Sequence, residues 1–119
     1  MATRSIVTVT GTNIALYKHW DGYPTVKGKD SDWLKFLIAF NRMFAKQRGV
    51  DPSYKIAQLL RRTAHYEKRF NLDESYYTGY GLIFYNKTTD KVVASEEYVY
   101  TLHDDGSVTY REANYENAI

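Results

Sequence analysis

The chain has no cysteine and only two prolines among its 119 residues. Without cysteine it cannot form disulfides, thiolate zinc sites, iron–sulfur clusters or a cysteine nucleophile. Long apolar runs are missing as well: no segment approaches the ~20 residues of a membrane-spanning helix, and residues 1–7 lack the apolar core of a signal peptide. We therefore expect a cytoplasmic protein without a membrane partner.

Length and composition indicate one globular domain, residues 1–119, because 44% of the residues are hydrophobic and 25% are charged. The formal net charge is only +2 but is unevenly distributed. Residues 27–69 contain eleven basic and four acidic residues, whereas residues 70–119 contain three basic and nine acidic ones. We expect this division to separate structural elements of one domain.

Strand patterns lie at both ends of the chain. Residues 5–10 and 14–20 are β-branched and aromatic runs separated by a short turn, which is typical of a hairpin. Residues 80–85, 92–102 and 108–110 have the same character, and an Asp-Gly turn precedes the last of them. These patterns predict five strands joined by hairpins.

The middle of the chain predicts two helices. Ser31 or Asp30 is placed to cap the first, Gly49 suits its end, and Asp51-Pro52 begins the second. The first helix has apolar residues at helical spacing: Trp33, Leu37, Phe40 and Phe44. The element order ββααβββ therefore predicts an α+β fold, with an antiparallel sheet of about five strands and both helices packed on one face.

Tyrosine is unusually abundant, at twelve residues. Tyrosines on one side of the later strands, with nearby acids, predict a partner-binding face if the helices cover the other side. An equally weighted alternative places these phenols in the core, with their hydroxyls reaching solvent. The candidate partner-binding residues are Tyr98, Tyr100, Tyr110, Glu96, Glu97 and Asp105.

The helical segment offers a basic surface as an alternative. Its cations can neutralise phosphates, and neighbouring aromatic rings can stack on bases. An ordinary solvated helix face explains the same pattern and is favoured, because the net charge of the whole chain is small. The candidate nucleic-acid-binding residues are Arg42, Lys46, Arg61 and Arg62.

The segment His19-Trp20-Asp21-Gly22-Tyr23-Pro24 is the most unusual local sequence. His19 and Asp21 are placed to form an acid–base pair, with Tyr23 nearby, as in a small hydrolase or a ligand-binding protein. The favoured interpretation is structural: a turn at Asp21-Gly22, with Trp20 packed against the fold. We assign no catalytic residue, metal site or cofactor, because no histidine pair has metal-ligand spacing and no glycine loop matches a phosphate-binding motif.

Residues 78–85 partly match the signature of RNA-recognition motifs, at Gly79, Tyr80, Gly81 and Tyr85. A basic and an aromatic position of that signature are unmatched, and two consecutive helices contradict the element order of that fold. We interpret the glycines as positions of a bulge or of close packing.

The His-Trp-Asp-Gly-Tyr-Pro motif of residues 19–24, following an N-terminal hairpin, resembles a group of small phage and prophage proteins without an established activity. This resemblance implies a mobile-element accessory protein in the cytoplasm of an infected host cell. It implies binding to, and inhibition of, a host protein or ribonucleoprotein complex, as in counter-defence proteins of the anti-CRISPR kind. The leading hypothesis is thus a non-enzymatic binding protein, monomeric or homodimeric, with nucleic-acid binding as the alternative.

Overall fold

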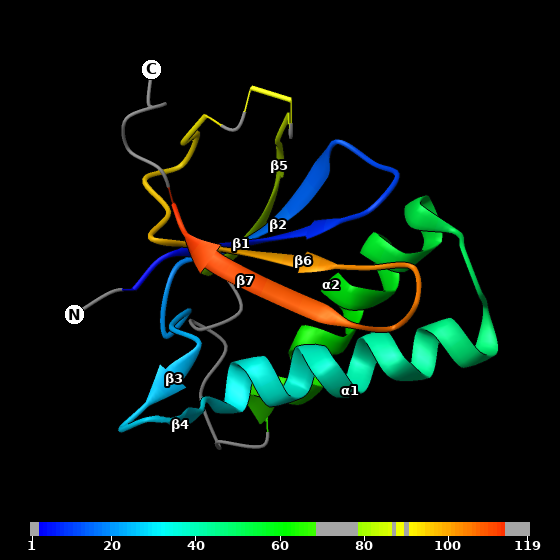
Figure 1. Ribbon diagram of the computed structural model, residues 1–119, viewed down its shortest axis with the longest axis horizontal. Coiled ribbons are helices and arrows are strands. Elements are labelled where there is room, and N and C mark those ends of the chain that lie inside the picture. The colour runs from blue at the N-terminus through cyan, green and yellow to red at the C-terminus, as the bar shows by residue number, and fades with distance from the viewer. Residues whose placement is uncertain (1–2, 69–78, 87, 90, 114–119) are drawn as a thin grey trace.

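The computed structural model describes residues 3–68, 79–86, 88–89 and 91–113 of the chain. These residues form a five-stranded sheet, a two-stranded hairpin and two helices, which is an α+β fold (Figure 1). The elements are β1 (Ser5–Val9), β2 (Ile14–Lys18), β3 (Thr25–Val26), β4 (Lys29–Asp30), α1 (Asp32–Gln47), α2 (Pro52–Lys68), β5 (Tyr80–Phe84), β6 (Tyr98–Leu102) and β7 (Val108–Glu112).

The large sheet has the strand order β5-β2-β1-β6-β7 and is mixed. The β1–β2, β2–β5 and β6–β7 pairs are antiparallel, but β1 and β6 are parallel, with Ser5 opposite Tyr98 and Val9 opposite Leu102. The prediction of a purely antiparallel sheet is therefore wrong. After the helices, β5 pairs with the edge of β2 that β1 leaves open. The chain must then cross the sheet before β6 can pair with β1, so a crossover and not a hairpin joins β5 to β6.

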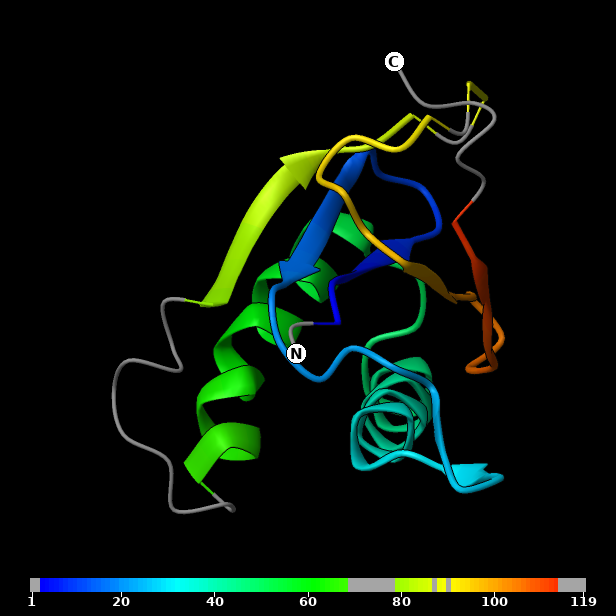
Figure 2. The same ribbon diagram turned by 90° about the vertical axis from the view of Figure 1, so that its left-hand side faces the viewer.

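The long strand expected over residues 92–102 is also shorter, because residues 91–97 form a loop before β6. Tyr85, which directly follows β5, packs with Ile6, Ala15 and Val99 on one face of the sheet. The described residues between β5 and β6 thus lie on the side of the sheet opposite the helices (Figure 2).

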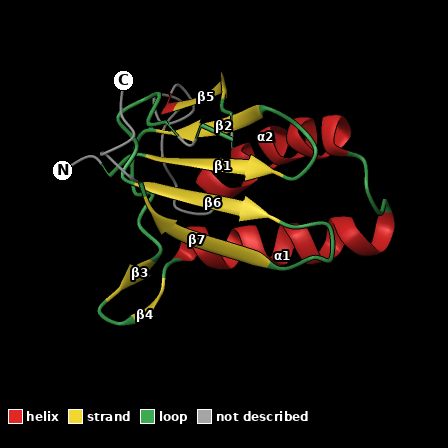
Figure 3. Ribbon diagram, turned by 45° about the horizontal axis from the view of Figure 1, so that its top comes forward, coloured by secondary structure: helices red, strands yellow, loops and turns green. Residues whose placement is uncertain are grey.

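The main core lies between the helices and the other face of the sheet. Val7, Leu16 and Leu102 on the strands are fully buried against α1 and α2. The predicted apolar stripe of α1 is confirmed, because Trp33, Leu37, Phe40 and Phe44 are all buried in this cluster. Both helices therefore cover one face of the sheet, as Figure 3 shows.

The sequence signals at the helix ends act as predicted. The Ser31 hydroxyl accepts a hydrogen bond from the Leu34 N–H at 3.0 Å and caps α1. Gly49 has φ 71°, a left-handed conformation that reverses the chain between α1 and α2 at low steric cost. The loop expected before α1 contains the small exposed hairpin β3–β4. In the described part of the chain, neither helix has the length and apolar character needed to cross a bilayer.

Candidate functional site

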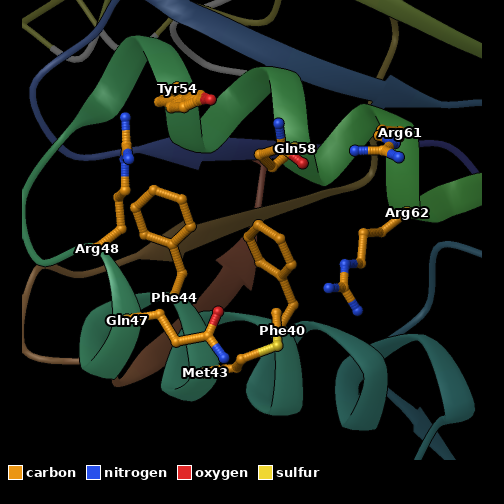
Figure 4. A pocket seen from close by; sticks show the side chains of 9 residues that line it. All are labelled: Phe40, Met43, Phe44, Gln47, Arg48, Tyr54, Gln58, Arg61 and Arg62. Atoms are coloured by element: carbon orange, nitrogen blue, oxygen red, sulfur yellow. The ribbon is translucent and has the colours of Figure 1, made fainter.

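A groove of about 380 Å³ opens to solvent between α1 and α2, with the sheet behind it (Figure 4). Buried aromatic rings form its floor, and longer polar side chains form its rim. The lining residues are Phe40, Met43, Phe44, Gln47, Arg48, Tyr54, Gln58, Arg61 and Arg62.

Helical spacing explains why these residues share one groove. Residues three or four positions apart lie on the same side of a helix, and Phe40, Phe44 and Gln47 follow this spacing on α1. Tyr54, Gln58 and Arg62 follow it on α2 and face them. The short loop between α1 and α2 places these two helix faces opposite each other, so they line one hollow.

The groove is positively charged, because among the described residues three arginines and no carboxylate line it. The Arg48 guanidinium lies over the Tyr54 ring, 3.9 Å from the ring centroid. Arg48 also pairs with Asp51 at 3.6 Å, but both side chains are more than one-third exposed, so this ion pair is weak. Arg48 therefore keeps most of its capacity to bind an external anion.

A second hollow continues the groove toward the end of α2. It is lined by Phe36, Arg62, His65, Tyr66 and Lys68, and it shares Arg62 with the first hollow. From Tyr54 to Lys68 the two hollows follow α2 for about 21 Å, at the helical rise of ~1.5 Å per residue. We call the two neighbouring hollows together the helical groove.

Glu67 is the only acidic residue of α2, and it does not reduce the positive charge of the helical groove. Its side chain is 3% exposed and forms an ion pair with Lys18 of β2 at 3.2 Å. The Tyr80 hydroxyl donates a second hydrogen bond to the same carboxylate. The exposed side of α2 consequently carries basic side chains but no carboxylate.

The Lys18 ammonium lies within an aromatic enclosure that sequence analysis did not predict. It is 4.7 Å from the ring centroids of Trp33 and Tyr80 and 5.3 Å from that of Tyr66. It also donates a hydrogen bond to the Tyr80 hydroxyl at 2.8 Å. Burial lowers the pKa of Lys18, and the neighbouring Glu67 carboxylate opposes that shift. Lys18 is only 4% exposed. Because it contacts Glu67 of α2 and Trp33 of α1, this cluster holds β2 against the helices.

The four basic residues proposed for nucleic-acid binding do not share one surface. Arg61 and Arg62 line the helical groove. Arg42 and Lys46 line a different hollow, between α1 and the β6–β7 turn, in which Asp104 and Asp105 also lie. Only the first pair therefore faces a surface without acidic neighbours.

The expected tyrosine face is not an exposed face of the sheet, so that prediction is wrong in its geometry. Tyr98 and Tyr100 do share one side of β6, but it is the side that packs against the helices. Tyr100 is fully buried, and its hydroxyl donates a hydrogen bond to the Gly22 carbonyl at 2.6 Å. Tyr110 is 44% exposed because it lies on the edge strand β7. Tyr100 is a core residue, as the alternative expected, but its hydroxyl does not reach solvent.

The three candidate acids are dispersed. Glu96 is 1% exposed, and its carboxylate accepts hydrogen bonds from the N–H groups of Val93 and Ala94. Glu97 is half-buried and accepts a hydrogen bond from the Arg4 N–H at 3.3 Å. Asp105 is exposed beyond the other end of β6, about 17 Å away at the rise of a five-residue strand. Hydrogen bonds from Ser107 lower the pKa of Asp105.

The His19–Pro24 segment makes the contacts of a structural turn. His19 Nδ1 lies 2.8 Å from the Tyr17 hydroxyl, and the His19 ring packs edge-on against Trp20. The Gly22 N–H donates to the Thr3 carbonyl at 2.9 Å. A Cβ at Gly22 would lie 2.4 Å from the Ser5 hydroxyl, so the close approach requires glycine.

The interpretation of Gly79 as a position of close packing is confirmed, because a Cβ there would lie 2.5 Å from the Trp20 ring. Burial raises the pKa of Tyr23, which lies in the His19–Pro24 segment. In the part of the chain that the structure describes, no three histidine, aspartate or glutamate side chains gather as a metal site.

Tyr54 and the two groove glutamines, Gln47 and Gln58, were not predicted from the sequence as site residues. Their helical spacing was readable, but the side of each helix that faces the other depends on how both pack on the sheet. Comparison with known proteins adds no further assignment: no family model, curated protein or solved structure matches the chain.

Proposed function

We propose that the protein binds single-stranded nucleic acid in the helical groove. The observation that carries this proposal is that arginines, aromatic rings and amide side chains line the groove, and that no carboxylate of the described ranges does. Arginine and lysine neutralise phosphates, while aromatic and guanidinium planes stack on unpaired bases.

The shape of the site favours a single strand over a duplex. The groove is concave, and its floor of Phe40 and Phe44 lies between two helices. A duplex is normally read by a convex element that enters one of its grooves, whereas single strands lie in basic channels with aromatic walls. Tyr54, which is 41% exposed and stacked by Arg48, provides a ring that a base can reach.

The predicted role against a host complex stays a prediction. A ribonucleoprotein partner is compatible with the proposed function, because its nucleic-acid component is the part that the groove would contact.

Fluorescence anisotropy with a labelled single-stranded oligonucleotide, titrated from 50 to 200 mM salt, tests the proposal. Four groove cations (Arg48, Arg61, Arg62 and Lys68) predict a slope of log K against log salt of about −2.8 for a single strand. Tyr54→Ala should weaken binding by about 1–3 kcal/mol, the usual contribution of one stacked base. An absence of binding at 50 mM salt would reject the proposed function.

The chain offers a matched control for charge. Arg61→Gln/Arg62→Gln should reduce the slope to about −1.4, because two phosphate contacts are lost. Arg42→Gln/Lys46→Gln removes the same charge from the hollow beside Asp104 and Asp105 and should leave the slope unchanged. Equal losses for both double variants would show that binding depends on net charge and is not located in the groove.

A further inference from the structure

β5 forms one edge of the large sheet, and its hydrogen-bonding pattern leaves one side of the strand open. It pairs with β2 only, with Leu82 opposite Leu16. The bonds that continue this ladder, from the His19 N–H to the Gly79 carbonyl and from the Tyr85 N–H to the Asn13 carbonyl, fix its alternation. In an antiparallel pair, alternate residues direct both backbone groups toward the neighbour. The odd-numbered residues therefore face β2, and Tyr80, Leu82 and Phe84 direct their N–H and C=O groups outward.

The exposed side chains of β5 are also apolar, and the strand carries no charge. Phe84 is 79% exposed and Leu82 is 50% exposed, and no residue of Tyr80–Phe84 carries a charge. Natural edge strands usually carry charges, proline or a bulge that prevents pairing with another chain. The opposite edge strand, β7, follows that rule, because it contains Arg111 and Glu112. Among the described residues, no other segment pairs with the open side of β5.

We propose that two copies of this chain pair antiparallel through β5, about a two-fold axis at Leu82. This register places Leu82 opposite Leu82 of the second copy and Tyr80 opposite Phe84. All three are positions with outward backbone groups, so each pair can exchange both of its hydrogen bonds. The two five-stranded sheets then become one sheet of ten strands.

The sequence of β5 favours a second copy of this chain as its pairing partner. The register is self-complementary, as a two-fold interface requires, and it brings uncharged residues together without placing like charges opposite one another. It also removes the exposed apolar side chains of Leu82 and Phe84 from water in both copies.

The helical layer leaves room for this pairing. α2 packs mainly against β1 and β2, inside the edge, and contacts β5 through the hydrogen bond from Tyr80 to Glu67. Lys18, Leu16 and Ile14 register with Tyr80, Leu82 and Phe84, and Lys18 and Leu16 point to the helix side. Leu82 and Phe84 therefore project into the space beside α2. The helical groove lies on the α1 side of α2, so dimer formation leaves it open.

Cysteine cross-linking tests the register, because the natural chain has no cysteine. In the proposed dimer the two Leu82 Cα atoms are about 5.5 Å apart, within the ~4.4–6.8 Å that a disulfide spans. Leu82→Cys should form a disulfide-linked dimer under mild oxidation. Phe84→Cys is the matched control: it is more exposed, but its two copies are about 14 Å apart in this register. Cross-linking of Phe84→Cys at the same rate as Leu82→Cys would overturn the proposal.

Sedimentation equilibrium tests the association without cross-links. We expect the mass to rise from 13.9 kDa toward twice that value with concentration. Phe84→Lys should hold it at the monomer value, because two cations would enter the interface, whereas Tyr110→Lys on the other edge should not. A monomer mass for the natural chain at all concentrations up to the millimolar range, or equal effects of both variants, would reject the β5 interface.

Discussion

Lys18 lies in an environment that is unusual for a lysine. A lysine that is 4% exposed has lost its hydration, and three aromatic rings and the Glu67 carboxylate replace the lost water. A buried ion pair of this kind gives little net stabilisation compared with apolar residues, but leaving one partner alone is costly. Its main effect is to fix the position of β2 against both helices.

Glu67→Gln should lower the free energy of unfolding by about 3–5 kcal/mol, because it leaves the Lys18 ammonium buried without an anion. The double variant Lys18→Met/Glu67→Gln should regain most of this loss, since no buried charge remains. Urea unfolding measures both. Asp51→Asn, which breaks the exposed pair with Arg48, should change the value by less than about 1 kcal/mol. A Glu67→Gln effect as small as this one would contradict the role given to the pair.

Buried phenols should make the fold sensitive to alkaline pH. Burial raises the pKa values of Tyr66 and Tyr100 above the ordinary 10.0. Their contribution to stability is complete below pH 10 and is lost above it, because the unfolded state then binds fewer protons than the folded state. Each phenol contributes a slope of about −1.4 kcal/mol per pH unit. Lys18, with its lowered pKa, acts in the opposite direction up to pH 10.5.

Tyr100→Phe separates these effects, because Lys18 is common to both proteins. At neutral pH it should cost about 1 kcal/mol, the value of the lost hydrogen bond to Gly22. Above pH 10 it should make the decline shallower by about 1.4 kcal/mol per pH unit. Urea unfolding at several pH values measures the two slopes, and parallel slopes would contradict the burial of this phenol.

At the scale of elements, local sequence signals predicted the helices well but predicted the strand pairings poorly. Both helices, the Ser31 cap and the apolar stripe of α1 follow from short-range spacing. The strand order does not follow from such spacing, because the sequence of β6 looks the same whether a hairpin or a crossover precedes the strand. The alternation of Tyr98 and Tyr100 was readable, but not which face the helices would cover. The same ambiguity hid the helical groove, whose two sides lie on separate helices.

One side chain connects the first helix to the last hairpin. Asn41 of α1 is fully buried, and its amide donates hydrogen bonds to the carbonyls of His103 at 3.0 Å and Ser107 at 2.7 Å. These carbonyls flank the turn between β6 and β7, and the His103 N–H also donates a hydrogen bond to the Ser107 carbonyl at 3.0 Å. Asn41 thus positions a hairpin that has a sheet neighbour on only one side.

Asn41→Leu should destabilise the protein by about 1–3 kcal/mol, because the two carbonyls lose a buried donor. The effect should concentrate in the hairpin, so amide hydrogen exchange of β7 should accelerate more than that of β1. Arg42→Ala, at the neighbouring exposed position, should leave both rates unchanged. Equal acceleration of β7 and β1 would mean that Asn41 supports the whole fold and not the hairpin.

At the scale of the whole molecule, the uneven charge of the sequence becomes a division between layers. The exposed sides of the helices carry the basic residues, and the acids of the later strands lie in the sheet edge and its turns. Sequence analysis predicted this division but assigned the binding role first to the acidic part. The folded chain favours the basic layer, because burial of Glu67 and Glu96 removes carboxylates from the surface while the arginines stay in solvent.

The parallel pairing of β1 with β6 has a consequence for how the protein is made. The hydroxyls of Thr8 and Thr101 meet at 3.1 Å in the middle of the sheet, although they are 93 positions apart. A ribosome that adds about 5–20 residues per second needs roughly 5–20 s to supply the missing neighbour. Throughout that interval the apolar first strand has one flank uncovered. This flank of β1 therefore stays open in the nascent chain until β6 has been synthesised.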